Sequence, residues 1–252
     1  MTKKAVLFDC DGVLVNTEQL GYCALKMILG EHDFGYTREE YVELVSGYEQ
    51  CEAVQVIQDD FFSKKGYYLP EDFGETAWAT VEDPNQKYLR AVKGMKSVLS
   101  RLHEEGIPIA VCSNNKRENV ERNLRRVGLL DYFDGHIYTK EDVENPKPAP
   151  DIYEMGADKL GIDPSDCFIV EDSQTGTKAG VAAGGTVIGF IGEAHRHIFK
   201  ESFLLAEAGA DIIATDGAKL KKHILMGVGI DEPPCPLFSC LLDTITNKPQ
   251  TP

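Results

Sequence analysis

Short apolar runs alternate along most of this chain with segments of helical periodicity. Each run is bounded by Gly, Pro or Asp, as expected of a buried strand. The runs are Ala5–Phe8, Ile107–Cys112, His136–Tyr138, Cys167–Val170 and Thr186–Ile191, with a weaker sixth at 210–215. The helical segments between them are 96–105, 116–127, 152–160 and 174–183. Strands that alternate with amphipathic helices are typical of βαβ units, so we predict an α/β fold with a parallel sheet covered on both faces.

One segment interrupts this alternation. Residues 17–88 contain no clear buried strand but show helical periodicity in three stretches. They also hold fifteen acidic residues against five basic ones, which a solvated helix surface explains most simply. The predicted fold is therefore a doubly wound, Rossmann-like core, residues 1–16 and 89–225, with a small inserted all-helical cap domain, residues 17–88. Residues 226–252 are predicted to be a C-terminal tail that is weakly structured or docked as one helix.

The overall composition excludes several classes of partner. A net charge of −15 and a pI near 4.8 argue against nucleic acid and against an anionic membrane surface, since both need a basic face. No apolar stretch approaches the length of about 18 residues that a membrane span requires. Seven scattered cysteines without metal-type spacing, and no signal peptide, favour a reducing, cytoplasmic location. We expect a monomer or a weak homo-oligomer.

Side chains suited to phosphate and metal chemistry follow the predicted strands. In an open parallel sheet, ligands bind outside the carboxyl ends of the strands, so these side chains should share one rim. They are Asp9 and Asp11 after the first strand, Ser113 and Asn114 after the second, Lys147 in a proline-braced loop after the third, and Glu171 and Asp172 after the fourth.

Carboxylates crowded on one rim repel each other unless a cation lies between them. Hard oxygen ligands without His or Cys favour Mg²⁺, which takes one or two carboxylates together with a substrate phosphate. Hydroxyl, amide and ammonium donors suit the oxygens of a phosphoryl group. The predicted cofactor is therefore Mg²⁺, and the predicted partner is a small phosphorylated metabolite.

The chain resembles the haloacid dehalogenase superfamily, in the branch that carries a helical cap after the first strand. Four motifs occur in the family's order across about residues 4–220: the D-x-D-G opening at Asp9, the Ser113–Asn114 step, the K-P-x-P loop at Lys147, and the E-D-S sequence at Glu171. Phosphatases and β-phosphoglucomutase-like enzymes belong to this branch.

The resemblance implies a role for each rim residue. Asp9 would attack phosphorus and form an aspartyl-phosphate, while Asp11 would act as the general acid and base. The residues that would bind the phosphoryl oxygens are Ser113, Lys147 and, alongside them, Asn114. The residues that would hold Mg²⁺ are Asp9, Asp11 through its backbone carbonyl, Asp172, and Glu171 directly or through a water.

Three functions remain open at this point. The aspartate at position 11 favours phosphate-ester chemistry over carbon–halogen cleavage, because the superfamily's dehalogenases lack it. A phosphatase is therefore the leading hypothesis, and a β-phosphoglucomutase-like mutase is the alternative. Such mutases carry an arginine after the glycine of the first cap turn and a histidine on the helix after the first strand, whereas this chain has Tyr48–Gln50 and Leu20–Tyr22 there. A non-catalytic phosphate binder would not need both Asp9 and Asp11.

Overall fold

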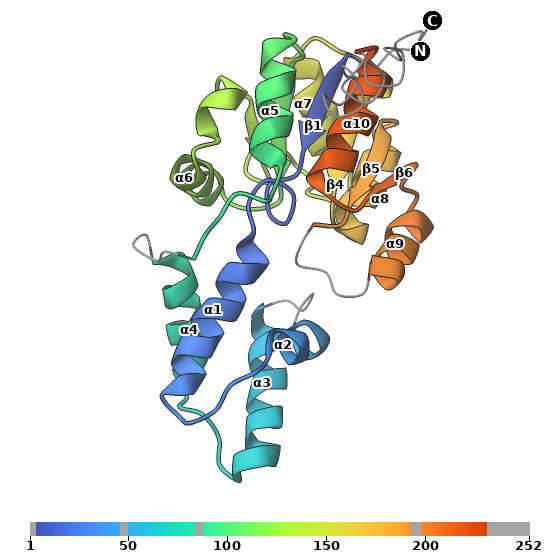
Figure 1. The fold of residues 1–252 in the computed structure, drawn as a ribbon. Helices are drawn as coiled ribbons and strands as arrows, with labels where there is room; N and C mark the ends of the chain where they lie inside the picture. Colours follow the sequence, from blue (N-terminus) through green and yellow to red (C-terminus); the bar gives the residue numbers. More distant parts are fainter. Residues whose placement is uncertain (1–3, 46–49, 84–87, 193–197, 231–252) are drawn as a thin grey trace, which may run out of the picture.

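The computed structural model describes residues 4–45, 50–83, 88–192 and 198–230. Within them, six parallel strands form one sheet in the order β3-β2-β1-β4-β5-β6 (Figure 1). The strands are β1 (Ala5–Phe8), β2 (Ile109–Ser113), β3 (Ile137–Thr139), β4 (Cys167–Glu171), β5 (Thr186–Phe190) and β6 (Ile212–Ala214). The predicted α/β fold is confirmed, and each predicted strand is present with its ends shifted by no more than two residues.

Helices alternate with the strands of the core along the chain, and the last of these helices follows β6. They are α5 (Met95–Glu104), α6 (Arg117–Val127), α7 (Asp151–Lys159), α8 (Gln174–Ala182), α9 (Ile198–Glu207) and α10 (Gly217–Val228). The sequence patterns predicted the first four of these within one residue at each end, but not α9 or α10. The predicted boundary between core and tail at residue 225 falls inside α10, and the rest of the predicted tail from residue 231 lies outside the described residues.

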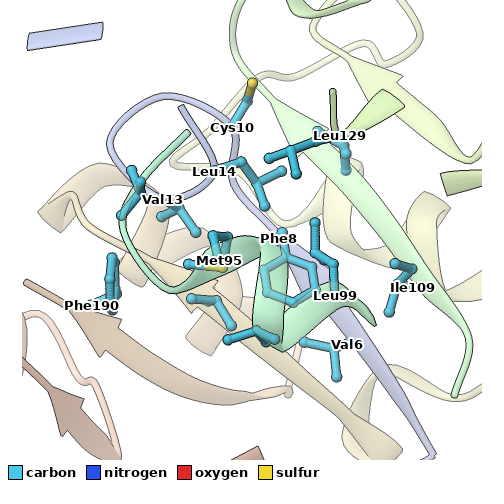
Figure 2. Close-up of a cluster of buried hydrophobic side chains, with 14 of the residues drawn as sticks. Val6, Phe8, Cys10, Val13, Leu14, Met95, Leu99, Ile109, Leu129 and Phe190 are labelled. Carbon is cyan, nitrogen blue, oxygen red and sulfur yellow. The ribbon is translucent and has the colours of Figure 1, made fainter. Parts of the chain in front are cut away.

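Both faces of the sheet are covered, because successive side chains of β1 point to opposite sides. Val6 and Phe8 pack in one hydrophobic cluster with side chains of α5, α6 and α10, part of which Figure 2 shows around Phe8, Met95 and Leu99. Leu7 belongs to a second cluster with α7 and α8 on the other face. The unbroken burial of β1, β2 and β4 is what a doubly wound sheet imposes on its central strands.

The order of the strands fixes where a ligand site can form. Strand β1 lies between β2 and β4, and the chain winds outward from it in both directions. This reversal creates a crevice at the carboxyl ends of β1 and β4, the place where doubly wound folds bind their ligands.

Four helices lie between β1 and α5 and form a separate body at the carboxyl ends of the strands (Figure 1). They are α1 (Thr17–Gly30), α2 (Arg38–Leu44), α3 (Gln50–Lys65) and α4 (Phe73–Glu82). These helices share a hydrophobic cluster of their own, with the Phe61 side chain fully buried at 0% exposure. The sequence patterns predicted α1, α2 and α3 but not α4.

The chain enters and leaves this helical body through two segments that run side by side. The Asn16 amide donates to the Arg90 carbonyl at 2.9 Å, and the Val92 amide donates to the Leu14 carbonyl at 3.0 Å. The Asn16 side chain also accepts from the Gln19 amide and so caps α1. None of the described helices is both long enough and apolar enough to span a bilayer.

The packing of α10 predicts that alanine at position 227 destabilises the protein, although alanine favours helix formation more than glycine does. A Cβ atom added at Gly227 would lie 2.1 Å from the Phe168 ring, which is almost fully buried. We expect Gly227→Ala to lower the free energy of unfolding by about 1–3 kcal/mol, because overpacking outweighs the gain of about 1 kcal/mol that alanine brings to a helix.

Gly30, the last residue of α1, is the matched control, since an added Cβ meets nothing within 4 Å there. We expect Gly30→Ala to leave stability unchanged or to raise it by up to about 1 kcal/mol. Urea unfolding of both variants measures the difference, and equal effects would contradict the packing argument.

Candidate active site

The site lies on the rim where β1, β2 and β4 end. Asp9 directly follows β1, and its amide donates to the Val170 carbonyl of β4 at 3.0 Å. Ser113 is the last residue of β2, and Glu171 is the last residue of β4. The pairing register of β1 places Asp9 level with Glu171, and Ser113 lies one residue further along the neighbouring strand.

Lys147 lies between two of the predicted carboxylates. Its Nζ donates to Asp9 Oδ1 and to Glu171 Oε1, each at 2.6 Å. The lysine side chain is 3% exposed and that of Glu171 is 0% exposed, so solvent hardly screens these ion pairs. Burial by itself lowers the pKa of Lys147, but the two carboxylates raise it by more, so the amine stays charged.

A tyrosine that the sequence patterns did not single out completes the surroundings of Lys147. The Tyr153 hydroxyl donates to Glu171 Oε1 at 2.5 Å, and Lys147 Nζ lies 4.8 Å from the centre of the Tyr153 ring. The other carboxylate oxygen, Oε2, accepts from the Ser173 hydroxyl at 3.1 Å. Both oxygens of Glu171 are therefore engaged in fixing Lys147 and the start of α8.

Asn114 lies on the rim as predicted, but its side chain is directed elsewhere. Its Oδ1 accepts from the Lys147 amide and its Nδ2 donates to the Lys147 carbonyl, both at 3.0 Å. This reciprocal pair fixes the backbone that carries Lys147. This geometry does not favour the predicted contact between the Asn114 side chain and a phosphoryl group, because the side-chain amide is already hydrogen-bonded to the Lys147 backbone.

Asp11 lies two residues after Asp9, in the segment that leads to the helical body. Its Oδ2 accepts a hydrogen bond from Asn115 Nδ2 at 3.2 Å. Burial raises the pKa of Asp11, while hydrogen bonds from Asn115 and Thr17 oppose that rise. Asn115 is the second rim residue that sequence reasoning missed.

Three carboxylates converge at the centre of the rim. Oxygens of Asp9, Glu171 and Asp172 all lie within 4.8 Å of one another. Gly12 makes room for this cluster: it has a φ of +81°, and a Cβ there would lie 1.7 Å from Asp172 Oδ2. The turn after Asp11 can therefore approach the Asp172 carboxylate only because residue 12 is glycine.

The charges of this cluster are only partly balanced within the chain. Burial raises the pKa values of Asp9 and Asp172, and repulsion from the neighbouring carboxylates raises them further. Lys147 offsets part of the charge on Asp9 and Glu171, but Asp172 receives less of it. An all-oxygen donor set with surplus negative charge fits a small divalent cation, and Asp9 and Asp172 are the residues placed to hold one.

The hydroxyl of Tyr153 leads to a prediction about stability. Tyr153→Phe should lower the free energy of unfolding by about 1.5–3 kcal/mol, because it removes a buried hydrogen bond to a charged carboxylate. Tyr132→Phe is the matched control, since the Tyr132 hydroxyl bonds the neutral Ser100 hydroxyl at 2.8 Å and should contribute about 0.5–1.5 kcal/mol. Denaturant unfolding of both variants tests this, and a smaller loss for Tyr153→Phe would contradict it.

Comparison with known proteins shows the family to which the chain belongs. The profile described as "Haloacid dehalogenase-like hydrolase" matches residues 6–190. The chain is similar to 6-phosphogluconate phosphatase of Escherichia coli K12, with 26% identity over 76% of this chain and 84% of that protein. It is also 31% identical over 73% of its length to the bifunctional riboflavin kinase/FMN phosphatase of Arabidopsis thaliana, of which it spans only 47%.

Solved structures agree with this result. A HAD family hydrolase from Deinococcus radiodurans R1, crystallised with bound phosphate and sodium, superposes with a TM-score of 0.76. The two chains are 29% identical, and the match covers 90% of this chain and 96% of the other. The chain described here belongs to the haloacid dehalogenase-like hydrolase family.

Proposed function

We propose that this protein is a Mg²⁺-dependent phosphatase that hydrolyses a small phosphorylated metabolite through an aspartyl-phosphate intermediate. One observation carries the proposal: the Asp9 carboxylate is held by Lys147 at the ligand-binding end of the sheet, beside an acidic cluster and two residues before Asp11. This arrangement provides a nucleophile, a nearby cation and a separate acid on one rim.

The reaction takes two steps in this arrangement. An oxygen of Asp9 attacks phosphorus, the ester P–O bond breaks, and the leaving oxygen keeps the bonding electrons and takes a proton from Asp11. Asp11, now a carboxylate, then takes a proton from a water molecule that attacks the phosphoaspartate. That attack releases inorganic phosphate and restores both Asp9 and the protonated Asp11.

Ser113 and Lys147 are placed to bind the phosphoryl group during both steps. Lys147 is already in contact with the nucleophile, so its charge lies where the negative phosphoryl oxygens must arrive. Ser113 ends the neighbouring strand, and its Oγ accepts from the Asn115 amide, which leaves the hydroxyl proton to donate. A Mg²⁺ ion held by Asp9, Asp172 and the backbone carbonyl of Asp11 would supply Lewis-acid stabilisation of the same oxygens.

The substrate class rests on the relatives and on the helical body. A similar protein is named as a 6-phosphogluconate phosphatase, and the related Deinococcus structure holds phosphate. We infer that residues 17–88 act as a cap, because their four helices lie over the carboxyl ends of the strands and are joined to the core by paired segments (Figure 1). Closure of this cap would exclude water and select the group attached to phosphate.

One contact in the cap favours a phosphatase over the β-phosphoglucomutase-like alternative. The histidine of such mutases is expected on α1, within Leu20–Tyr22. At Gly21 an added Cβ would lie 2.7 Å from the Tyr41 hydroxyl, and Tyr41 is buried in the cap's own cluster. A larger residue at position 21 would displace Tyr41. Of the positions compared for the arginine, Tyr48–Gln50, the first two lie outside the described residues.

The central test is Asp9→Asn. This nearly isosteric change removes the attacking oxygen's charge, so we expect activity on 4-nitrophenyl phosphate to fall by about a thousandfold or more while the protein stays folded. Asp131→Asn, at an exposed position away from the rim, is the control and should keep full activity.

The metal assignment has a test of its own. EDTA should abolish the wild-type rate and added Mg²⁺ should restore it. Equal rates in EDTA and in Mg²⁺ would contradict the metal assignment.

A second test separates hydrolysis from mutase chemistry. We expect β-glucose 1-phosphate with a trace of glucose 1,6-bisphosphate to yield little or no glucose 6-phosphate. A second phosphate would meet a segment with ten more acidic than basic residues, and its repulsion could weaken binding by about ten- to a hundredfold. Coupled detection of glucose 6-phosphate measures this, and efficient conversion would overturn the choice of phosphatase.

A further inference from the structure

Asn115 connects the acid/base residue to the phosphoryl-binding strand, and neither the sequence motifs nor the family match assigns it a role. We propose that Asn115 is a positioning residue that holds the Asp11 carboxyl group in the orientation needed for proton transfer to the leaving oxygen. The inference rests on the proposed phosphatase function and deepens it.

The orientation of the Asn115 amide is fixed by its other partners. Its Oδ1 accepts from the Lys116 backbone amide at 2.8 Å and from Asn119 Nδ2 at 3.1 Å. If the amide were flipped, two N–H donors would face its NH₂ group and no donor would face Asp11. The amide oxygen therefore points toward α6, and Nδ2 must point toward Asp11 Oδ2.

The backbone of Asn115 holds the same residue against the phosphoryl-binding side of the rim. Its amide donates to Ser113 Oγ at 3.1 Å. Asn115 thus contacts the serine that would bind the phosphoryl group and the aspartate that would protonate the ester oxygen. A shift of this turn would change the spacing between those two groups.

The contact with Asp11 reaches across 104 residues of sequence and joins the core to the segment that leads into the cap. Asp11 forms an isolated β-bridge with Val15, which in turn pairs with Ala91 on the returning segment. Asn115 holds Oδ2, and Thr17 also makes a hydrogen bond to this carboxyl group, so the two contacts together fix its orientation. Without Asn115, the carboxyl group keeps only the contact with Thr17, gains rotational freedom, and directs the proton less often at the ester oxygen.

This role makes a distinctive prediction about leaving groups. As the ester bond breaks, the proton of Asp11 passes to the leaving oxygen, which keeps the bonding electrons. Phenolate is a strong enough base to need that proton early, whereas 4-nitrophenolate leaves well without it. Loss of proton transfer should therefore slow phenyl phosphate much more than 4-nitrophenyl phosphate, although the two substrates differ by a single nitro group.

The experiment compares kcat/KM for these two esters, because kcat/KM covers steps up to the first irreversible one and leaves out the later attack of water. In Asn115→Ala we expect a loss of about tenfold or more for phenyl phosphate and of less than about threefold for 4-nitrophenyl phosphate. Affinity for inorganic phosphate, measured by calorimetry, should stay within about twofold. Glu118→Gln, exposed on the first turn of α6, is the control and should change neither rate.

Asn115→Asp separates the contact with Asp11 from the contact with α6. Aspartate keeps an acceptor for the Lys116 amide but offers no donor to Asp11. The added negative charge should weaken the binding of both phosphate esters to the same extent. The ratio of the two kcat/KM values should therefore shift as it does in Asn115→Ala. A wild-type ratio in Asn115→Asp, or equal losses for both esters in Asn115→Ala, would overturn the positioning role. An inactive wild-type protein would instead overturn the proposed function on which the inference rests.

Discussion

The ion pairs of Lys147 with Asp9 and Glu171 hold together the part of the structure on which function depends. The lysine comes from the loop after β3, and its partners follow β1 and end β4, so one ammonium group joins three connections of the sheet. A buried ammonium group is costly unless it is paired, and so are the carboxylates. Each charge is therefore tolerated because of the others. The hydrogen bonds that Asn114 exchanges with the Lys147 backbone, and those that Tyr153 and Ser173 donate to Glu171, remove most of the freedom to rearrange.

The incomplete balance of charge in this cluster explains how an acidic protein can bind an anionic substrate. One lysine cannot neutralise four carboxylates. Burial raises the pKa values of Asp9, Asp11 and Asp172, and repulsion from neighbouring carboxylates raises those of Asp9 and Asp172 further. A phosphate ester would add two more negative charges. A divalent cation resolves both difficulties at once, since it satisfies the carboxylates and presents positive charge to the phosphoryl oxygens. The overall charge of −15 therefore argues against polyanions but not against a metal-bound phosphate.

The sequence was informative where topology alone decides position. Ser113 and Glu171 end buried strands, and Asp9 and Asp172 follow them directly. The carboxyl ends of parallel strands share one edge whatever the details of packing. Side-chain direction is a different matter. Asn114 and Asn115 are adjacent and chemically identical, yet one fixes the Lys147 backbone and the other contacts Asp11, because the turn after β2 points them apart.

The helices that sequence reasoning missed have a related physical cause. An amphipathic pattern is clear when a helix buries one stripe of large side chains, as α5 does on the sheet. In α9 the pattern is obscured, because Phe199 is 93% exposed and Phe203 is 66% exposed. In α10 the close approach to Phe168 requires Gly227, a residue that local propensity counts against a helix. Tertiary packing therefore overrides local propensity in α10, whereas in α9 exposed aromatic side chains hide the apolar stripe.

The position of Asp11 links the chemistry of the rim to the movement expected of a cap. Asp11 lies four residues before Val15, and Val15 pairs with Ala91 where the two connecting segments run together. A displacement of those segments would reach Asp11 through this short, hydrogen-bonded stretch. Asn115 belongs to the core and not to the connections, so its contact opposes such a displacement at the carboxyl group itself. Asp9, the proposed nucleophile, directly follows a strand at the centre of the sheet and is already held by Lys147.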